Sequence, residues 1–521
     1  MRAVHVEKDR YLDSVLLMSI SQEVKSLPNV ADAVVCMATP ANVKYLRGIG
    51  FEAAQLVETS PNDLVIAIEA ADGQTIEAAR AQAAQMLEAR RGRPFDQDDQ
   101  FLPTTLSEAV AILPEANLLI VSVPGAFAAR EAREGLRRGL HVMLFSDNVS
   151  IDDEVTLKQE ALRRGLLMMG PDCGTAMING KPLGFANAVR RGTIGIVGAS
   201  GTGIQEISSL IHRAGGGISQ AIGTGGRDLS QAVGGLMTEF GAATLSEDPH
   251  TEVIVVVSKF PAPEVAGRLL SALEQTDKAC VVHFVGSQRQ AERGHIRFAQ
   301  TLDEAAILAC NEAGIEGEAI RPASDEELAA LAGAESGGRN ARQLHLRGLF
   351  CGGTLCQEAW SILDQQDLEV FSNVALRPEH RLKPGQESEG SGHLLWDLGD
   401  DAFTVGRPHP MIEPSLRDEH VIAAAHDPSV GVVLVDLVLG HGAHPDPAVG
   451  LAEVVEKAKS IASERGEVLP VVASVTGTDL DPQGYDRQVN LFQQAGIRVM
   501  RSNAEAARLA LHVVRVATGE A

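Results

Sequence analysis

The sequence TIGIVGASGTGIQEISSL, residues 193–210, decides the fold of this chain. Its first five residues are predominantly β-branched, a pattern typical of a buried parallel strand. Gly198, Gly201 and Gly203 then interrupt the pattern, and from Ile204 onward the apolar residues recur at helical spacing. A strand, a glycine-rich turn and a helix in this order predict an anion site, because the turn presents N–H groups and the helix dipole adds partial positive charge.

The turn also supplies hydroxyl groups to such a site. Ser200 and Thr202 can donate to an oxyanion, so the predicted phosphate-binding residues are Ser200, Gly201, Thr202 and Gly203. Glycines in strand-to-helix turns also serve for close packing alone, and a single copy of the motif leaves that alternative open.

The chain contains this stretch twice. Residues 200–206 (SGTGIQE) match residues 352–358 (GGTLCQE) at an offset of 152 residues (352 − 200). Residues 303–306 (DEAA) match residues 504–507 (AEAA) at an offset of 201 (504 − 303), so the second copy has longer loops. A repeat of more than a hundred residues indicates a duplicated domain.

Two such domains packed about a pseudo-twofold axis would aim two helix N-termini at one phosphoryl or acyl-phosphate group. The second turn adds Gly352, Gly353 and Thr354 to the predicted phosphate-binding residues. Glu206 and Glu358 follow the two threonines by one helical turn and are predicted to be catalytic. The alternative is that Thr-x-x-Gln-Glu only begins a helix well.

The second loop of each repeat contains further candidates. Gly226, Arg227 and Asp228 are predicted to bind the substrate in the first repeat, and Arg407 and His409 are predicted catalytic residues in the second. Arginine can clamp the carboxylate of a small acid with two parallel hydrogen bonds.

Upstream of the first repeat, residues 118–169 alternate between strand and helix patterns, which predicts a parallel sheet covered by helices. The last of these strands runs into residues 170–175 (GPDCGT), at the strand end where open α/β sheets bind ligands. Asp172 and Cys173 are therefore predicted to bind the substrate. Cys173 is a nucleophile in one interpretation and a buried structural thiol in the commoner one. Residues 316–343 are rich in Gly, Ala and Glu and are expected to form a linker.

Composition limits the function classes. The chain has 521 residues and a formal net charge of −24, which argues against nucleic-acid and anionic-membrane surfaces. Its six cysteines form no zinc pattern, so no metal site is expected, and their density suits a reduced cytosol. The N-terminus has no signal-peptide pattern and the apolar runs are too short to span a bilayer. A cytoplasmic protein with a small anionic substrate is expected.

Several motifs resemble those of one family. Residues 170–174 (GPDCG) are similar to the Gly-Pro-Asn-Cys-Pro-Gly turn of the succinyl-CoA synthetase α subunit, and residues 195–206 are similar to its strand and power helix. Residues 121–128 (VSVPGAFA) resemble its Val-Pro-x-x-Phe-Ala segment. The second repeat resembles the C-terminal CoA-ligase domain of the partner β subunit.

The layout of nearly the whole chain, including residues 13–15, 145–149 and 404–411, resembles the FdrA family. This resemblance implies an α/β fold with an N-terminal Rossmann-like domain of the CoA-binding type, followed by two duplicated flavodoxin-like domains. The expected boundaries are 1–180 for the first domain (with an N-terminal extension to about 103), 181–318 and 344–521 for the two repeats, and 319–343 for the linker.

The chain also departs from the synthetase. No segment resembles an ATP-grasp domain, and the glycine-rich CoA loop has no counterpart in residues 10–24, which argues against CoA binding while leaving it open. The synthetase's Gly-His-Ala-Gly phosphohistidine loop is replaced by residues 286–298, in which His295 is the one candidate for phosphorylation. A fixed histidine of this kind is more often structural.

The resemblance implies a subunit of an oxamate carbamoyltransferase in allantoin or purine degradation, assembled with other carbamoyltransferase subunits. Its ligand would be phosphate or carbamoyl phosphate. Two alternatives stay open: an ADP-forming acyl-CoA synthetase subunit that depends on a separate ATP-grasp chain, and a non-catalytic regulatory scaffold.

Overall fold

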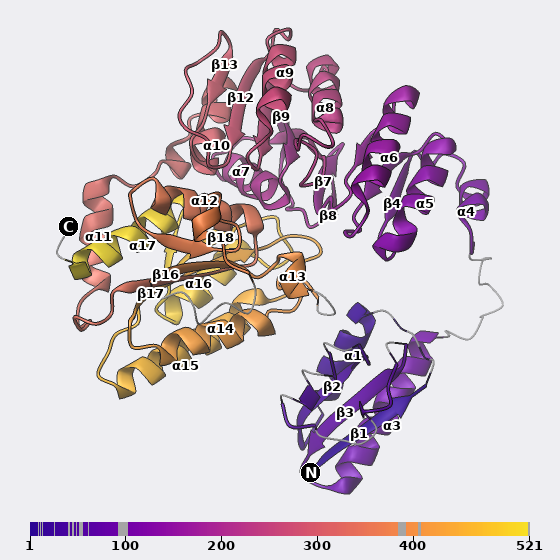
Figure 1. Ribbon diagram of the computed structural model, residues 1–521, viewed down its shortest axis with the longest axis vertical. Helices are drawn as coiled ribbons and strands as arrows, with labels where there is room; N and C mark the ends of the chain where they lie inside the picture. Colours follow the sequence, from indigo (N-terminus) through magenta and orange to yellow (C-terminus); the bar gives the residue numbers. More distant parts are fainter. Residues whose placement is uncertain are drawn as a thin grey trace. The chain divides into compact units, whose positions relative to one another are not determined.

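The structure is a computed structural model of the chain (Figure 1). It describes all residues except 9, 11, 13, 26, 40–41, 44–45, 48, 52–55, 61, 92–102, 384–391, 405–407 and 519–521. Arg407, one of the predicted catalytic residues, therefore lies outside the described residues. Internal contacts divide the chain into two compact units, residues 1–109 with 401–409 and residues 110–400 with 410–521.

The first unit is built on a three-stranded antiparallel sheet in the order β1-β3-β2. Its central strand is buried along almost its whole length, and α1 and α3 contribute apolar side chains to the same core. Residues expected to extend a Rossmann-like domain thus have a separate, antiparallel sheet of their own. The elements are β1 (Arg2–Glu7), α1 (Ser14–Lys25), β2 (Val30–Met37), β3 (Leu64–Ala70), α3 (Gly73–Arg91) and α13 (Asp401–Thr404).

The second unit starts with a three-stranded parallel sheet in the order β4-β5-β6, as the alternating pattern predicts. Ser150 caps α6 by accepting a hydrogen bond from the Asp153 N–H, and Gly165 ends the helix in the left-handed conformation at φ 66°. The elements are α4 (Leu106–Ile112), β4 (Leu118–Val121), α5 (Gly125–Arg137), β5 (His141–Leu144), α6 (Ile151–Arg164) and β6 (Met168–Met169).

The first repeat forms five parallel strands in the order β10-β9-β11-β12-β13, which the hairpin β7-β8 extends in antiparallel fashion. The hairpin was not expected from the sequence. The elements are β7 (Thr175–Ile178), β8 (Lys181–Gly184), β9 (Arg191–Ala199), α7 (Gly201–Arg213), β10 (Ile218–Gly223), α8 (Leu236–Glu247), β11 (Val253–Ser258), α9 (Pro263–Leu273), β12 (Ala279–Phe284), β13 (Ile296–Phe298) and α10 (Leu302–Glu312).

The second repeat forms a six-stranded parallel sheet in the order β15-β16-β14-β17-β18-β19. Apart from β15, this order is that of the first repeat, so the predicted duplication and its flavodoxin-like strand order are confirmed. The elements are β14 (His345–Phe350), α12 (Gly353–Asp364), β15 (Val370–Ser372), η3 (Pro378–His380), β16 (His393–Asp397), α14 (Ser415–His426), β17 (Val430–Val438), α15 (Pro447–Glu464), β18 (Val471–Thr476), α16 (Tyr485–Gln494), β19 (Arg498–Met500) and α17 (Asn503–Thr518).

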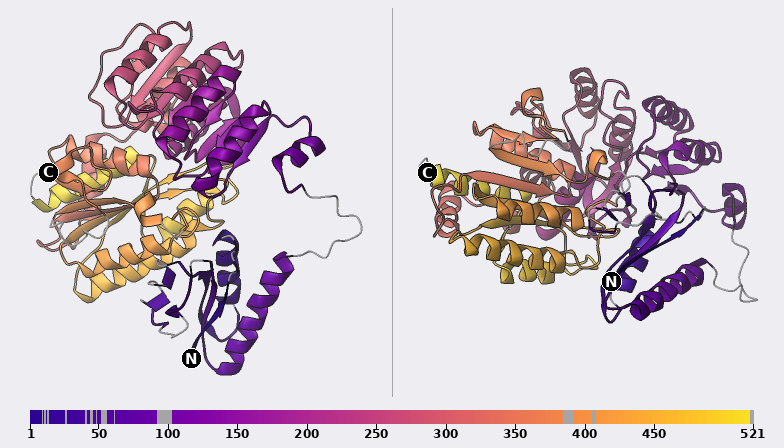
Figure 2. Two further views of the ribbon diagram at one scale, coloured as in Figure 1. Left: turned by 45° about the vertical axis from the view of Figure 1, so that its right-hand side comes forward. Right: turned by 60° about the horizontal axis from the view of Figure 1, so that its bottom comes forward.

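Four helices lie between the two repeat sheets and join them into one core. Helices α7 and α10 cover the inner face of the first sheet, and α12 and α17 cover the inner face of the second (Figures 1 and 2). Their buried apolar side chains belong to a single cluster that includes both sheets. The two glycine turns, which begin α7 and α12, are therefore held by the packing of the repeats against each other.

The segment expected to be a linker contains structure of its own. After η2 (Glu318–Ile320), helix α11 (Asp325–Glu335) begins with a capping box between Ser324 and Glu327. Leu328 and Ala332 are fully buried in the core that joins the repeats. The linker expectation for residues 319–343 is corrected: part of this stretch is a packed helix.

Candidate functional site

Three turns from separate strands enclose a small cavity at the N-terminus of α7. They are the turn after β6, the glycine turn after β9 and the loop after β10, and the cavity has a volume of about 10 Å³. Its lining residues are Asp172, Cys173, Gly174, Thr175, Gly198, Ser200, Gly201, Gly223, Gly225 and Gly226. The structure thus brings together Ser200, Gly201, Gly226, Asp172 and Cys173, which the sequence places in three different motifs.

The glycine turn leaves hydrogen-bond donors available at this cavity. Ser200 is the N-cap of α7 and accepts a hydrogen bond from the Gly203 N–H at 3.2 Å. The N–H groups of Gly201 and Thr202 have no hydrogen-bond partner in the described part of the chain, as expected for the first turn of a helix. These donors and the helix dipole favour an anion at this point.

The two glycine turns meet, as the duplication predicts. The Ser200 hydroxyl lies 2.7 Å from the Thr354 hydroxyl, and both side chains are buried. A Cβ atom placed on Gly352 would lie 3.1 Å from the Thr202 methyl carbon, so the close approach of the turns leaves little room for a larger residue there.

The second turn differs from the first in charge. The N–H groups of Cys351 and Gly352 each donate at 2.8 Å to the carboxylate of Asp436, which lies in β17. Burial raises the pKa of Asp397, at the end of β16, to about 7, and its Oδ2 lies where a Cβ on Gly353 would clash. Asp436 thus occupies the N–H donors of Cys351 and Gly352, and Asp397 adds a second acid beside Gly353; the phosphate site at Gly352, Gly353 and Thr354 stays a prediction.

Strand register explains why only the second turn has carboxylates beside it. In the first repeat Gly198 pairs with Val257 on one side and Gly223 on the other. In the second repeat the equivalent residue, Phe350, pairs with Asp397, and continuing the register places Asp436 on its other side. Valine and glycine in the first repeat thus stand where the second repeat has two aspartates.

Asp228 supports the loop after β10 and is not free to bind a substrate. Its carboxylate accepts hydrogen bonds from the N–H groups of Met237 and Thr238, at the start of α8, and lies 2.7 Å from the ammonium group of Lys158. Arg227 donates to the Val149 carbonyl oxygen. The predicted substrate-binding role of Asp228 is corrected, because a fully buried carboxylate with these partners has no capacity left for another ligand.

Cys173 faces the cavity as a thiol. Burial raises its pKa to about 12, and its Sγ lies 3.4 Å from the Gly223 carbonyl oxygen and 3.6 Å from that of Thr175. A protonated thiol is a poor nucleophile, so the geometry favours the structural interpretation over the nucleophilic one. Asp172 is exposed at the rim of the cavity.

Glu206 and Glu358 each accept a hydrogen bond from the opposite repeat. Glu206, on α7, accepts from the Asn503 N–H at the start of α17, and Glu358, on α12, accepts from the Leu302 N–H at the start of α10. Asn503 and Leu302 are equivalent positions at the repeat offset of 201 (503 − 302). Each glutamate therefore caps a helix of the opposite repeat. Neither lines the cavity, and these hydrogen bonds support a structural role for both, while the catalytic role stays a prediction.

The remaining predicted residues lie elsewhere. His409 belongs to the first unit, whereas the cavity residues belong to the second, and burial lowers the pKa of His409 to about 4. Its proposed partner Arg407 lies outside the described residues. The imidazole Nε2 of His295 lies 3.0 Å from the Leu273 carbonyl oxygen.

Thr175 and Gly223 line the cavity but were not predicted to do so. Asp436 was missed as well, although it interrupts an otherwise apolar strand, residues 430–438, and this interruption is a readable signal of a buried functional carboxylate.

Comparisons with known proteins define the class. A family model described as CoA-ligase matches residues 349–513, one described as CoA binding domain matches residues 189–286, and one described as AllF, heavy metal-associated domain, matches residues 1–100. Succinate–CoA ligase [ADP-forming] subunit alpha of Methanothermobacter thermautotrophicus is 27% identical over 176 residues, which cover 33% of this chain and 58% of that relative. The chain has a succinyl-CoA-synthetase-like acyl-CoA ligase fold.

The family follows from a longer match. Uncharacterized protein YahF of Escherichia coli (strain K12) is 43% identical over 513 residues, which cover 97% of each chain. The chain belongs to the same family as YahF. Among solved structures, the dinucleotide-forming acetyl-coenzyme A synthetase 1 of Ca. Korarchaeum cryptofilum aligns over 78% of this chain and 84% of its own length, at 15% identity and a TM-score of 0.28.

Residues 1–100, which match the AllF, heavy metal-associated domain model, do not supply the ligands that a heavy metal needs. Cys36 is the single cysteine in residues 1–100, and burial raises its thiol pKa to about 12, so no thiolate is available as a ligand. Across the described residues, no group of three or more His, Cys, Asp and Glu side chains is placed to hold a metal ion. We derive no step through a metal.

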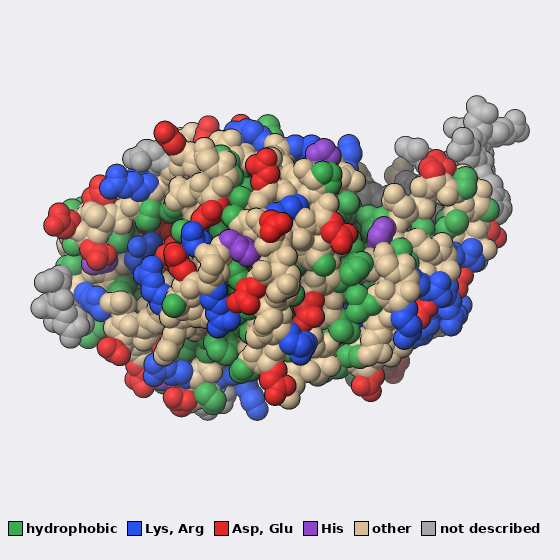
Figure 3. Space-filling model, turned by 90° about the horizontal axis from the view of Figure 1, so that it is seen from above, with side chains coloured by type: hydrophobic (Ala, Val, Ile, Leu, Met, Phe, Trp, Pro, Cys, Tyr) green, Lys and Arg blue, Asp and Glu red, His purple; other side chains and the backbone are tan. Residues whose placement is uncertain are grey.

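The molecular surface mixes both charges. On the face drawn in Figure 3, acidic and basic side chains are interspersed and no continuous basic area is visible. In the described residues, no helix combines the length and the apolar composition needed to cross a membrane.

Proposed function

We propose that this chain is a subunit of an oxamate carbamoyltransferase of the FdrA type, which moves a carbamoyl group between phosphate and a small acid. The observation that supports this proposal is the open glycine turn of the first repeat, where the N–H groups of Gly201 and Thr202 remain available beside a cavity. The FdrA-like layout supports the carbamoyl chemistry, and the AllF model over residues 1–100 supports a link to allantoin degradation.

The proposed carbamoyl transfer requires the protein mainly to bind and orient the phosphate and the small acid. In the direction of phosphorolysis, a phosphate oxygen bonds to the carbamoyl carbon, the bond from that carbon to the amide nitrogen of the acid breaks, and the nitrogen takes the proton of hydrogen phosphate. Fixed N–H donors hold the phosphate and stabilise the negative charge that develops in the transition state. A cavity without a thiolate suits direct transfer of this kind.

CoA does not fit this cavity as a whole molecule. Its volume of about 10 Å³ is that of roughly one water molecule, whereas pockets for drug-sized ligands span roughly 300–1,000 Å³. We derive no step through CoA at this cavity.

Gly201→Asp tests the anion site against a matched variant, Gly201→Ala. Both place a Cβ atom 3.3 Å from the Thr175 hydroxyl oxygen, so they differ only in the added carboxylate. We expect Gly201→Ala to bind phosphate or carbamoyl phosphate much as the wild type does, and Gly201→Asp to bind at least about tenfold more weakly, because two anions would share the turn. Titration calorimetry measures both affinities.

The same pair separates binding from folding. An aspartate in the first turn of a helix stabilises it by about 0.3–1 kcal/mol, so the melting temperature of Gly201→Asp should not fall below that of Gly201→Ala. Equal phosphate affinity in the two variants would contradict the anion site and the proposed function that rests on it.

The match to the CoA-ligase model favours a second candidate, a subunit of an ADP-forming acyl-CoA ligase that works through a phosphohistidine. His295 is the residue to test. Its Nε2 lies within hydrogen-bond distance of the Leu273 carbonyl oxygen, so this nitrogen carries a hydrogen and is held in place. We expect no labelled phosphate on the purified chain after incubation with ATP. Acid-labile label that disappears in His295→Gln would favour the ligase instead.

A further inference from the structure

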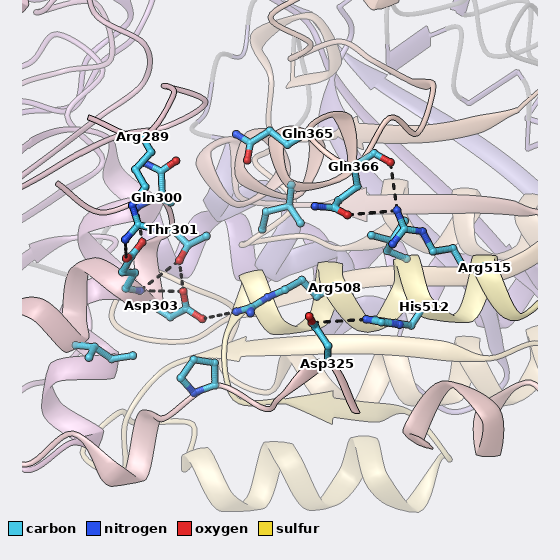
Figure 4. Close-up of a pocket in the computed structure, with 15 residues that line it drawn as sticks. Arg289, Gln300, Thr301, Asp303, Asp325, Gln365, Gln366, Arg508, His512 and Arg515 are labelled. Atoms are coloured by element: carbon cyan, nitrogen blue, oxygen red, sulfur yellow. Dashed lines mark hydrogen bonds and ion pairs between the residues drawn. The ribbon is translucent and has the colours of Figure 1, made fainter. Parts of the chain in front are cut away.

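A second and larger cavity lies between the repeats, on the helices that join them. It has a volume of about 510 Å³ and lies among α10, α11, α12 and α17 (Figure 4). Pockets of roughly 300–1,000 Å³ hold cofactors and other small molecules, so this space takes a ligand far larger than phosphate. Figure 4 shows the side chains of Arg289, Gln300, Gln365 and Arg515 arranged around a common opening.

One wall of this cavity is basic. Arg508, His512 and Arg515 recur at i, i+4 and i+7 and so lie on one face of α17. The Arg508 guanidinium donates through Nη2 to Asp303 at 3.3 Å and through Nε to the Ala504 carbonyl oxygen, and its Nη1 has no partner in the described residues. Arg515 donates to the backbone and side-chain oxygens of Gln366 at 3.3 Å. These bonds are long, so a stronger acceptor such as a phosphate would displace Gln366 from the guanidinium group.

The other walls are apolar and amide-bearing. Ile307, Ile362 and Leu511 line the space between the charged groups, and the side-chain amides of Gln300 and Gln365 make no hydrogen bond in the described part of the chain. An apolar slot with amides at its edge suits a flat heterocycle that has donors and acceptors on its rim.

The acidic side chains in the cavity are already engaged. Asp303 accepts from the Ser502 hydroxyl at 2.8 Å and from Arg508, and Glu304 accepts from the Gln300 N–H at 2.7 Å. Asp325 is the exposed one, 3.9 Å from Nε2 of His512. The acids thus come from α10 and α11, whereas Arg508 and Arg515 come from α17.

We propose that this cavity binds a nucleoside phosphate, with the phosphates on Arg508 and Arg515 and the base in the apolar slot edged by Gln300 and Gln365. Size, paired guanidinium groups and the apolar slot together favour this class over a small acid. The nucleotide end of CoA has the same chemistry as a free nucleotide, so either source satisfies the site. The proposal is independent of the carbamoyltransferase proposal, because the glycine turns do not line this cavity.

A ligand bound in this cavity is coupled to the glycine turns through the start of α10. Asp303 begins α10 beside Leu302, whose N–H donates to Glu358 on α12. A ligand that draws Arg508 away from Asp303 therefore acts on a helix start that both repeats share. We expect ADP to raise the melting temperature of the full chain.

The experiment measures the affinity of the full chain for ADP and for CoA, with adenosine and inorganic pyrophosphate as partial ligands. Arg508→Gln and Arg515→Gln should each weaken ADP binding by about ten- to a hundredfold, whereas adenosine and pyrophosphate should bind far more weakly than ADP to the wild type. Arg498→Gln is the matched control, because Arg498 pairs with Glu335 outside the cavity. It should leave ADP binding unchanged.

Two further variants keep the result interpretable. Gln365→Ala removes an exposed amide without touching the core, so it reports on binding if Arg508→Gln folds poorly. Gly201→Asp should leave ADP binding intact, which separates this site from the phosphate site. Tighter binding of CoA than of ADP would assign the group to CoA, and the reverse to a free nucleotide. Failure of both to bind at about 1 mM, or binding unaffected by Arg508→Gln and Gln365→Ala, would overturn the proposal.

Discussion

Replacing Lys158 with methionine is expected to lower the free energy of unfolding by about 3–5 kcal/mol, because it leaves the buried Asp228 carboxylate without its counter-charge. Glu154 keeps the Arg227 guanidinium at 2.9 Å. The side chains of Lys158, Glu154 and Asp228 are all fully buried. The ammonium group of Lys158 donates to both carboxylates at 2.7 Å and to the Thr224 carbonyl oxygen at 2.9 Å. Chemical denaturation of the full chain measures the loss.

The same substitution should also affect the candidate site at the N-terminus of α7. Lys158, on α6, holds the loop after β10 through Thr224 and Asp228, and the neighbouring Gly223, Gly225 and Gly226 line the cavity. We therefore expect weaker phosphate binding in Lys158→Met as well as lower stability. The exposed Lys181→Met is the control, and should change stability by no more than about 0.5 kcal/mol. A comparably small loss in Lys158→Met would mean that water replaces the ammonium group.

The parts of the site that could be predicted from the sequence are those formed by short, continuous motifs. A strand, a glycine turn and a helix are local, so residues 193–210 fix their own structure, and the second copy at an offset of 152 residues predicts that two such helices pack together. The contact between the Ser200 and Thr354 hydroxyls is the result. The equivalent starts of α10 and α17 were predictable for the same reason.

The charge at the second turn could not be predicted in this way. Asp436 lies in a strand about eighty residues after the turn whose N–H groups it accepts from, and only the register of β14 against β17 brings them together. Asp228 illustrates the same limit, since a polar residue in a glycine-rich loop resembles a ligand until its buried partner, Lys158, is known. In both cases the deciding partner is a single residue far away in the sequence.

Helix α11 was missed for a different reason. The abundance of Gly, Ala and Glu in residues 316–343 is typical of a linker, and composition was given more weight than pattern. Ser324 followed three residues later by Glu327 is the signature of a capping box, and Leu328 and Ala332 have the spacing of one buried helix face. Those two signals were present in the sequence.

Glu206 and Glu358 are expected to differ when each is changed to glutamine. The two oxygens of Glu358 accept from two donors, the Leu302 N–H and the Asn503 side-chain amide. The amide group of a glutamine would face the Asn503 amide as a second donor, and turning Asn503 over would break its bond to the Leu355 carbonyl oxygen. We expect Glu358→Gln to cost about 1–3 kcal/mol of unfolding free energy.

Glu206→Gln should cost less. Its second partner is the Thr476 hydroxyl, which can accept from an amide as readily as it donates to a carboxylate. Changing both residues to alanine should give a non-additive loss, with a coupling of about 0.5–3 kcal/mol, because Asn503 bridges the two glutamates. Glu264, an exposed acid in the first turn of α9, is the control, and its change to alanine should cost less than about 1 kcal/mol.

The pH dependence of stability distinguishes Glu358 further. Burial raises its pKa from 4.5 to about 8, so the folded chain holds this proton more tightly than the unfolded chain does. The stability that this group contributes is complete below pH 4.5 and is lost as the pH rises through about 8. The stability of the wild type should therefore fall relative to that of Glu358→Gln across this window, and a parallel pH profile would contradict the buried, protonated glutamate. If instead either glutamine variant loses carbamoyl transfer, measured with its partner subunits, at an unchanged melting temperature, the glutamate acts in the reaction itself and the predicted catalytic role would be supported.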